Sequence, residues 1–137
     1  MSDIAFEWKE MGMLAAKDLD AAELLLASPK PHYRIICFLA QQSAEKYLKA
    51  FLGVNGHEPD DNKTHNLTTL LYDCFDIDKS LVELKEECRT LKLYAVAPRY
   101  PGFKKNAPEE KLAQFSSEVI SLAKKIESEL VGRCPVL

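Results

Sequence analysis

The chain has 137 residues, of which 47% are hydrophobic and 28% are charged, and its formal net charge is -3 at pH 7. This length and composition are typical of one globular domain and leave little room for a second unit with its own core. The slightly acidic balance argues against a broad basic surface for sequence-independent nucleic-acid binding, so RNA is a less favoured partner, although local basic patches remain compatible with it.

The sequence shows no sign of export, membrane insertion or metal binding. Charged residues interrupt the N-terminal stretch, which argues against a secretory signal. The longest apolar run, 35–40, is far shorter than the roughly 20 residues that span a bilayer. The cysteines and histidines lack the spacing of zinc ligands or of a redox dithiol, and we expect Cys37 and Cys88 to be buried free thiols. We therefore expect a cytoplasmic protein without a membrane segment, a metal or a cofactor.

Apolar residues recur at steps of three and four, and no segment alternates as a strand does. The first helix is expected over about 3–27, where a pair of prolines stops it. The second is expected from about Pro31 to the region 53–56, whose glycines suit a C-terminal cap. A shorter helix follows residues 64–65 and fades near 76–78.

A fourth helix begins near Ser80, and its amphipathic seam ends at Pro98. The last helix follows Asn106, a suitable N-cap. Long helices joined by short connections pack most simply as an antiparallel bundle. We therefore predict an all-α fold, an antiparallel four-helix up-and-down bundle with an additional short helix. It forms a single domain over 1–131, followed by a loosely held tail over 132–137.

The second helix carries a polar side opposite its apolar face. This side also includes two large apolar residues, and its members are Phe38, Gln41, Gln42, Glu45, Lys46, Lys49 and Leu52. In one interpretation it is a solvated surface on which Glu45 and Lys49 form a pair worth roughly 0.2–0.5 kcal/mol. In the other, a second subunit or the loop after the fourth helix covers it, so that the charges need protein partners. Polar groups beside apolar anchors favour the second interpretation.

The stretch 97–105 places an arginine, two aromatic rings and two lysines in a turn that prolines restrict. Arg99 can bind a carboxylate or a phosphate with two parallel hydrogen bonds, and Tyr100 can stack on a base. Arg99 could equally hold this turn against Glu45 of the second helix. His65 opens the third helix, where capping or packing is the ordinary role of such a residue.

Several segments together resemble the HEPN domain family. The run 38–52 is similar to the central helix of these domains, and 16–22 with Tyr33 is similar to their first helix. His65-Asn66-Leu67 and Arg99-Tyr100-Pro101-Gly102 then follow in the family's order and approximate spacing. The resemblance implies an antiparallel helical bundle and frequent homodimers. It also implies association with small nucleotidyltransferase proteins, often as one half of a toxin–antitoxin pair.

Many HEPN proteins are metal-independent ribonucleases that use an arginine followed by a histidine four to six residues later. No arginine of this chain has a histidine at that distance, so the resemblance does not extend to the usual catalytic pair. Carried over position by position, the resemblance implies these functional or dimer-defining residues: Gln42, Glu45, Lys46, Lys49, His65, Arg99 and Tyr100.

Three hypotheses follow. The leading one is a non-catalytic module that binds a nucleotide or phosphate group, with Lys46, Lys49 and Arg99 on the phosphate, Tyr100 stacking on the base and His65 nearby. The second is a ribonuclease with an atypical site, which brings Arg99 and His65 together within one chain or across a dimer.

The third hypothesis is a pure interaction protein. In this reading, the polar side of the second helix docks an identical subunit or a nucleotidyltransferase partner. Phe38 and Leu52 would be the apolar anchors, and Gln42 and Glu45 would support the contact.

Overall fold

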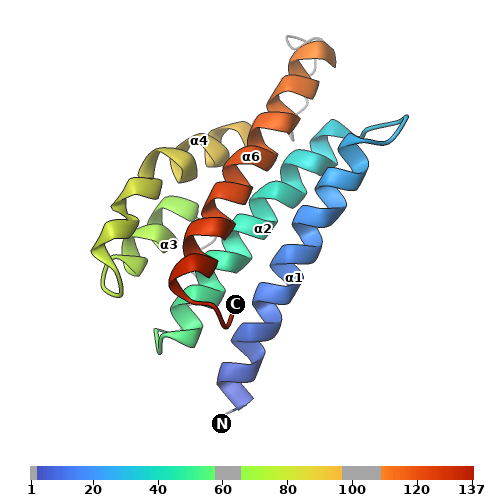
Figure 1. Cartoon of the computed structure of the whole chain (residues 1–137). Helices are drawn as coiled ribbons and strands as arrows, with labels where there is room; N and C mark the ends of the chain where they lie inside the picture. Colours follow the sequence, from blue (N-terminus) through green and yellow to red (C-terminus); the bar gives the residue numbers. More distant parts are fainter. Residues whose placement is uncertain (1–2, 58–65, 97–108) are drawn as a thin grey trace.

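The computed structural model describes residues 3–57, 66–96 and 109–137, with side chains over 6–57, 66–93 and 113–137. Every regular element in these ranges is helical (Figure 1). The elements are α1 Asp3–Leu26, α2 Tyr33–Val54, α3 Leu67–Cys74, the 3-10 helix η1 Lys79–Leu84, α4 Lys85–Val96 and α6 Glu109–Arg133. The predicted all-α class is confirmed.

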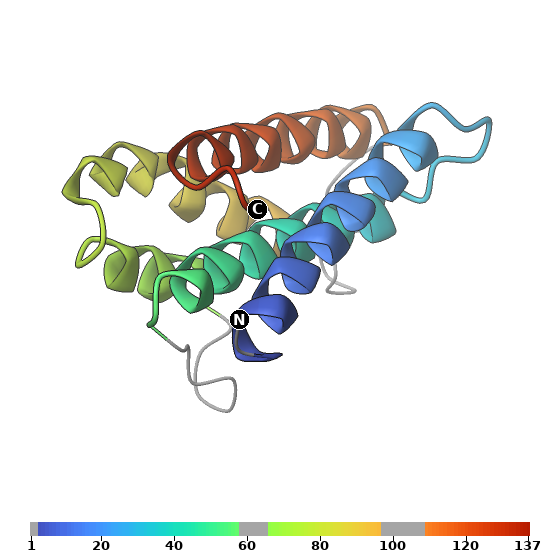
Figure 2. The same ribbon diagram turned by 60° about the horizontal axis from the view of Figure 1, so that its bottom comes forward.

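Helix α2 lies at the centre of the bundle, where α1, α3, α4 and α6 all pack against it. Figures 1 and 2 show α1 and α2 running in opposite directions side by side, with α6 along the other side of α2. The shorter α3 and α4 cover the remaining side. This is the predicted antiparallel bundle with one additional short helix.

The core consists of one apolar stripe from each helix, because residues three and four apart share a face of a helix. The largest fully buried side chains include Leu19, Ile36, Phe51, Leu70, Leu84, Leu91 and Ile126. All of them lie in segments where the apolar spacing predicts a helix. The packing of these stripes around α2 fixes the orientation of its remaining, polar side.

The C-terminal end of α2 is a Schellman motif. Gly56 has a φ of +83°, a conformation that glycine adopts without steric cost. Its backbone N–H donates to the Gly53 carbonyl at 3.1 Å, and that of His57 donates to Leu52 at 2.8 Å. A glycine cap in this region was expected. The start of α2 differs from expectation: His32 is the N-cap, since its carbonyl accepts the first helical bond, from Ile36.

Asp78 starts the next helical segment, because its carboxylate accepts a hydrogen bond of 2.9 Å from the backbone N–H of Ser80. The first part of that segment is a 3-10 helix, and the α-helix expected from Ser80 begins only at Lys85. In a 3-10 helix, residues three apart lie directly above one another. Leu81 and Leu84 have this spacing, and both are fully buried, so the tighter helix turns both leucines into the core.

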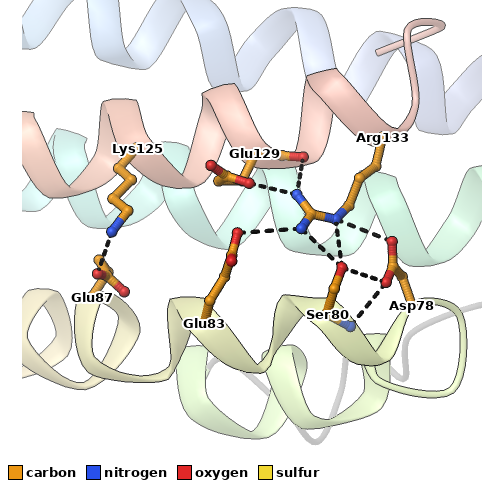
Figure 3. Close-up of polar contacts among 7 residues, drawn as sticks. All are labelled: Asp78, Ser80, Glu83, Glu87, Lys125, Glu129 and Arg133. Carbon is orange, nitrogen blue, oxygen red and sulfur yellow. Dashed lines mark hydrogen bonds and ion pairs between the residues drawn. The ribbon is translucent and has the colours of Figure 1, made fainter.

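The C-terminal residues are anchored more firmly than the expected loose tail. Helix α6 continues to Arg133, whose guanidinium reaches three carboxylates (Figure 3). It lies 3.1 Å from Asp78, 3.3 Å from Glu83 and 2.6 Å from Glu129. Beyond it, Leu137 packs against the core. The C-terminal end of α6 is held in place because one arginine offers five donors in a rigid plane and can join α6 to η1.

Replacing Arg133 with glutamine is expected to lower the melting temperature by about 3–6 °C. The reason is that Asp78, Glu83 and Glu129 all lose the guanidinium to which they are bound. A hydrogen bond from Arg133 holds the pKa of Glu129 below its ordinary value of 4.5. This stabilisation is therefore present above pH 4.5 and is lost as the pH falls through the lower, folded-state pKa. Thermal melts at neutral and acidic pH should show a smaller acid-induced loss in the variant.

Lys125→Gln is the matched control for Arg133→Gln. It removes one ion pair, Lys125–Glu87 at 2.7 Å, which joins α6 to the neighbouring α4 (Figure 3). The Lys125 side chain is half exposed, and that of Glu87 is largely buried. A single ion pair to an exposed lysine is expected to contribute little to stability. Equal losses in the two variants would show that the Arg133 contacts do not act as a network.

Candidate functional site

The polar side of α2 is the best candidate for a functional site in the described part of the chain. We call Gln41, Gln42, Glu45, Lys46 and Lys49 the α2 polar stripe. Three of its members are almost inaccessible, with exposed fractions of 7% for Gln41, 6% for Glu45 and 5% for Lys49. The stripe is therefore largely covered within a single chain, in agreement with the second of the two sequence interpretations. Its charged groups are not a solvated surface.

The most deeply buried charges of the stripe belong to Glu45 and Lys49. Their carboxylate and ammonium lie 3.5 Å apart, one helical turn from each other on α2. Withdrawing two charges from water costs several kcal/mol per ion, and apolar replacements of such pairs are often equally stable. Stability alone therefore does not explain this pair. Departures from the rules of core composition tend to occur at functional sites.

Lys46 is bound to the neighbouring helix. Its ammonium lies 2.5 Å from the carboxylate of Asp18 on α1, and both side chains are partly buried. An anionic ligand would have to share this lysine with Asp18 or displace that carboxylate. Gln42, at the same edge of the stripe, is partly buried. This edge is the more accessible part of the stripe.

Two buried polar atoms on the same side of α2 lack a hydrogen-bond partner in the described part of the chain. They are Oε1 of Gln41 and Nη2 of Arg34. Residues seven apart in a helix lie nearly above one another, and Phe38, 39% exposed, lies between them. An unmade hydrogen bond at a buried group costs about 1–3 kcal/mol. A bound ligand or an ordered water molecule would satisfy both atoms.

The predicted site residues fare differently in the structure. His65, Arg99 and Tyr100 lie outside the described residues, and so does the proposed contact between Arg99 and Glu45. Phe38 is exposed enough to contact a ligand or a partner. The prediction that Leu52 is an apolar anchor for docking is wrong, because this residue is buried in the core and offers no surface to a partner. The reason is that helices pack around this end of α2 from several sides.

Other polar groups of α2 join helices together. The Tyr47 hydroxyl donates a hydrogen bond to the Glu127 carboxylate of α6. Burial, together with the neighbouring Glu127, raises the pKa of Tyr47. Ser43 donates to the backbone carbonyl of Ala15 on α1 at 2.7 Å. These bonds fix the rotation of α2 and hence the direction of the α2 polar stripe.

The described cysteines are not poised for chemistry. Cys37, Cys74 and Cys88 are buried and Cys134 is partly buried, all as free thiols. Burial raises the pKa of Cys88 to about 12. A thiol of this kind stays protonated at neutral pH and is a poor nucleophile. The expectation of buried free thiols at Cys37 and Cys88 is confirmed.

Within the described ranges, no three histidine, cysteine, aspartate or glutamate side chains come together as a metal site would require. Over those residues too, no helix combines the length and the apolar character that crossing a membrane would need.

Two contributors to the site are absent from the sequence-based set. Arg34 lies on the same side of α2 as Gln41, nearer the start of the helix. The spacing of seven residues between the two would have indicated this from the sequence. Asp18 carries no such signal, because its partner Lys46 is 28 residues away in the chain. A contact between two helices depends on how the helices are rotated against each other, which local spacing does not reveal.

Comparison with known proteins identifies one family. A family model described as "HEPN domain" matches residues 8–131, nearly the whole chain. No curated protein matches the chain, and no solved structure matches it.

Proposed function

The chain belongs to the HEPN domain family, and we propose that it is a non-catalytic module that binds a nucleotide or another phosphate-bearing group at the α2 polar stripe. One observation carries the proposal: Gln41 and the Glu45–Lys49 pair are more than nine-tenths buried on one side of a central helix. Burying polar groups of this kind costs stability, and such departures from an apolar core tend to occur at functional sites.

The groups along this side suit different parts of a nucleotide. The guanidinium of Arg34 and the ammonium of Lys46 suit a phosphate. The exposed ring of Phe38 suits a base, which can stack on it. The unpartnered Oε1 of Gln41 can accept a hydrogen bond from an amine of the base. Lys49 supports the site through Glu45.

The roles of His65, Arg99 and Tyr100 in phosphate binding and stacking stay predictions. The proposal also includes a setting: a cytoplasmic homodimer that acts with a small nucleotidyltransferase protein in a toxin–antitoxin-like pair. This setting rests on the family resemblance alone. Co-purification of the chain with the product of a neighbouring nucleotidyltransferase gene tests it.

The direct test is the melting temperature of the full chain with and without a panel of nucleotides. A ligand at 100 times its dissociation constant adds roughly 2.7 kcal/mol, which should raise the midpoint by about 5–15 °C in a domain of this size. We expect a selective rise with one class of nucleotide. The absence of a shift with every nucleotide would contradict the proposal.

Gln41→Leu separates binding from folding. Leucine removes a buried acceptor that lacks a partner, so the variant without ligand should melt at the same temperature as the wild type or slightly higher. The shift caused by the nucleotide should fall by at least half. Lys125→Gln, on α6, is the control that should keep the full shift. A full shift in Gln41→Leu would place the ligand elsewhere.

A further inference from the structure

A second surface lies on the outer side of α3, where that short helix meets η1. Two neighbouring hollows of about 430 and 340 Å³ share Tyr72 and Phe75 in their walls. We call them together the α3–η1 groove. The core-facing residues of α3 point the other way, since Leu70 and Cys74 are fully buried. The groove is thus separate from the α2 polar stripe.

The groove displays apolar side chains that no described element covers. Tyr72 is 70% exposed and Val82 is 52% exposed, and Phe75 is partly buried between them. The rings of Tyr72 and Phe75 lie 5.7 Å apart, inclined at 56°, an arrangement in which aromatic pairs attract each other. Single exposed apolar residues are ordinary, but a group of them around hollows marks an interaction site.

Positive charges outnumber negative ones among the residues that line the groove. Arg89 is held by Glu86 at 2.9 Å. Lys79 and Lys85, one lining each hollow, make no ion pair with any described residue, and Asp76 is the remaining carboxylate of the lining. The groove is therefore locally cationic on a chain whose net charge is -3.

We propose that the α3–η1 groove docks a short acidic segment of a partner protein. Two apolar side chains of that segment would enter the hollows on either side of Tyr72, and its carboxylates would meet Lys79 and Lys85. Tyrosine is enriched among the residues that dominate binding energy in protein interfaces. Along η1, at about 2 Å per residue, the two lysines are roughly 12 Å apart. An extended segment spans this distance with carboxylates about four residues apart.

Other occupants fit less well. Single-stranded nucleic acid needs a row of cations along its backbone, whereas the described lining of this groove offers Lys79 and Lys85 together with the carboxylate of Asp76. A symmetric dimer of this chain would bring the same surface against itself, so that two surfaces with an excess of positive charge would face each other. An acidic peptide supplies both the apolar anchors and the opposite charge.

The test is selection of a random-peptide display library on the full chain. We expect the enriched peptides to carry two apolar residues flanked by aspartate or glutamate. Their synthetic forms should bind the wild type and lose at least tenfold in affinity for Tyr72→Ala and for the double variant Lys79→Glu with Lys85→Glu. These side chains are exposed, so both variants should melt within a few degrees of the wild type.

Leu24→Ala and Lys30→Glu are matched controls, because both residues are exposed and lie far from the groove in the chain. They should bind the peptides as the wild type does. Enriched peptides without acidic residues, or peptides that bind Tyr72→Ala unchanged, would overturn the proposal. Two further results would also overturn it. One is binding of a labelled oligouridylate that Tyr72→Ala abolishes, and the other is a dimer in sedimentation that the same variant abolishes. The nucleotide-induced melting shift should persist in Tyr72→Ala, which keeps this proposal independent of the one for α2.

Discussion

Replacing Lys49 with methionine is expected to lower the free energy of unfolding by roughly 3–5 kcal/mol, the range found when one partner of a buried ion pair is removed. The side chain of Lys49 is 7% exposed, and its ammonium lies 3.5 Å from the Glu45 carboxylate. Methionine keeps the volume of the stem but removes the ammonium that lies against the buried Glu45 carboxylate. The urea midpoint, followed by far-ultraviolet circular dichroism, measures the loss.

The double variant Glu45→Gln with Lys49→Met is the control for this loss. It removes both charges and keeps the shapes of both side chains, so most of the lost stability should return. Lys124→Met is a second control, since it breaks the exposed pair Lys124–Glu23, at 2.9 Å, and should change stability far less than Lys49→Met does. If Lys49→Met changed stability as little as Lys124→Met does, the pair would behave as solvated.

The same double variant bears on function. If Glu45 and Lys49 are retained for ligand binding, the variant should fold almost as stably as the wild type and yet lose the nucleotide-induced melting shift. If they are retained for folding, stability should stay low and the shift should survive. The two outcomes separate recognition from structure at the centre of the α2 polar stripe.

Most of the fold follows from local spacing. The apolar steps around Ile36 and Phe51, or Leu84 and Leu91, predict helices, because burial of one stripe per helix is what stabilises a bundle. The helix boundaries are harder to predict, since they depend on which hydrogen bonds form within a single turn. The 3-10 start of the fourth helical segment arises from the way Leu81 and Leu84 reach the core, and this becomes visible only once the helices have been packed.

The site divides in the same way. Charged residues on a helix that also carries Phe38 indicated a covered polar face, and burial of Glu45 and Lys49 agrees with that. The pairing of Lys46 with Asp18 could not be predicted, because it depends on the rotation of α1 against α2. Leu52 was misplaced for the same reason: its angular position resembles that of its polar neighbours, but packing at that end of α2 buries it.

Replacing Gly53 with alanine is expected to destabilise the fold by about 1–3 kcal/mol, even though alanine favours helices by about 1 kcal/mol over glycine. A Cβ at this position would lie 2.2 Å from two ring atoms of Trp8 on α1. The indole must therefore move away from α2 and lose its packing. Trp8 is the chain's single tryptophan, so its emission should shift to longer wavelength as the ring enters water.

Gly132→Ala tests whether this effect is specific. Gly132 is also helical, but nothing lies within 4 Å of a Cβ built there, so alanine should leave stability unchanged or raise it by up to about 1 kcal/mol. The two glycines should thus respond with opposite sign to the same substitution. Adding Trp8→Ala to Gly53→Ala should remove most of the extra cost, because the clash then has no second partner. Responses of the same sign, with unchanged Trp8 emission, would mean that α1 and α2 do not approach closely at this point.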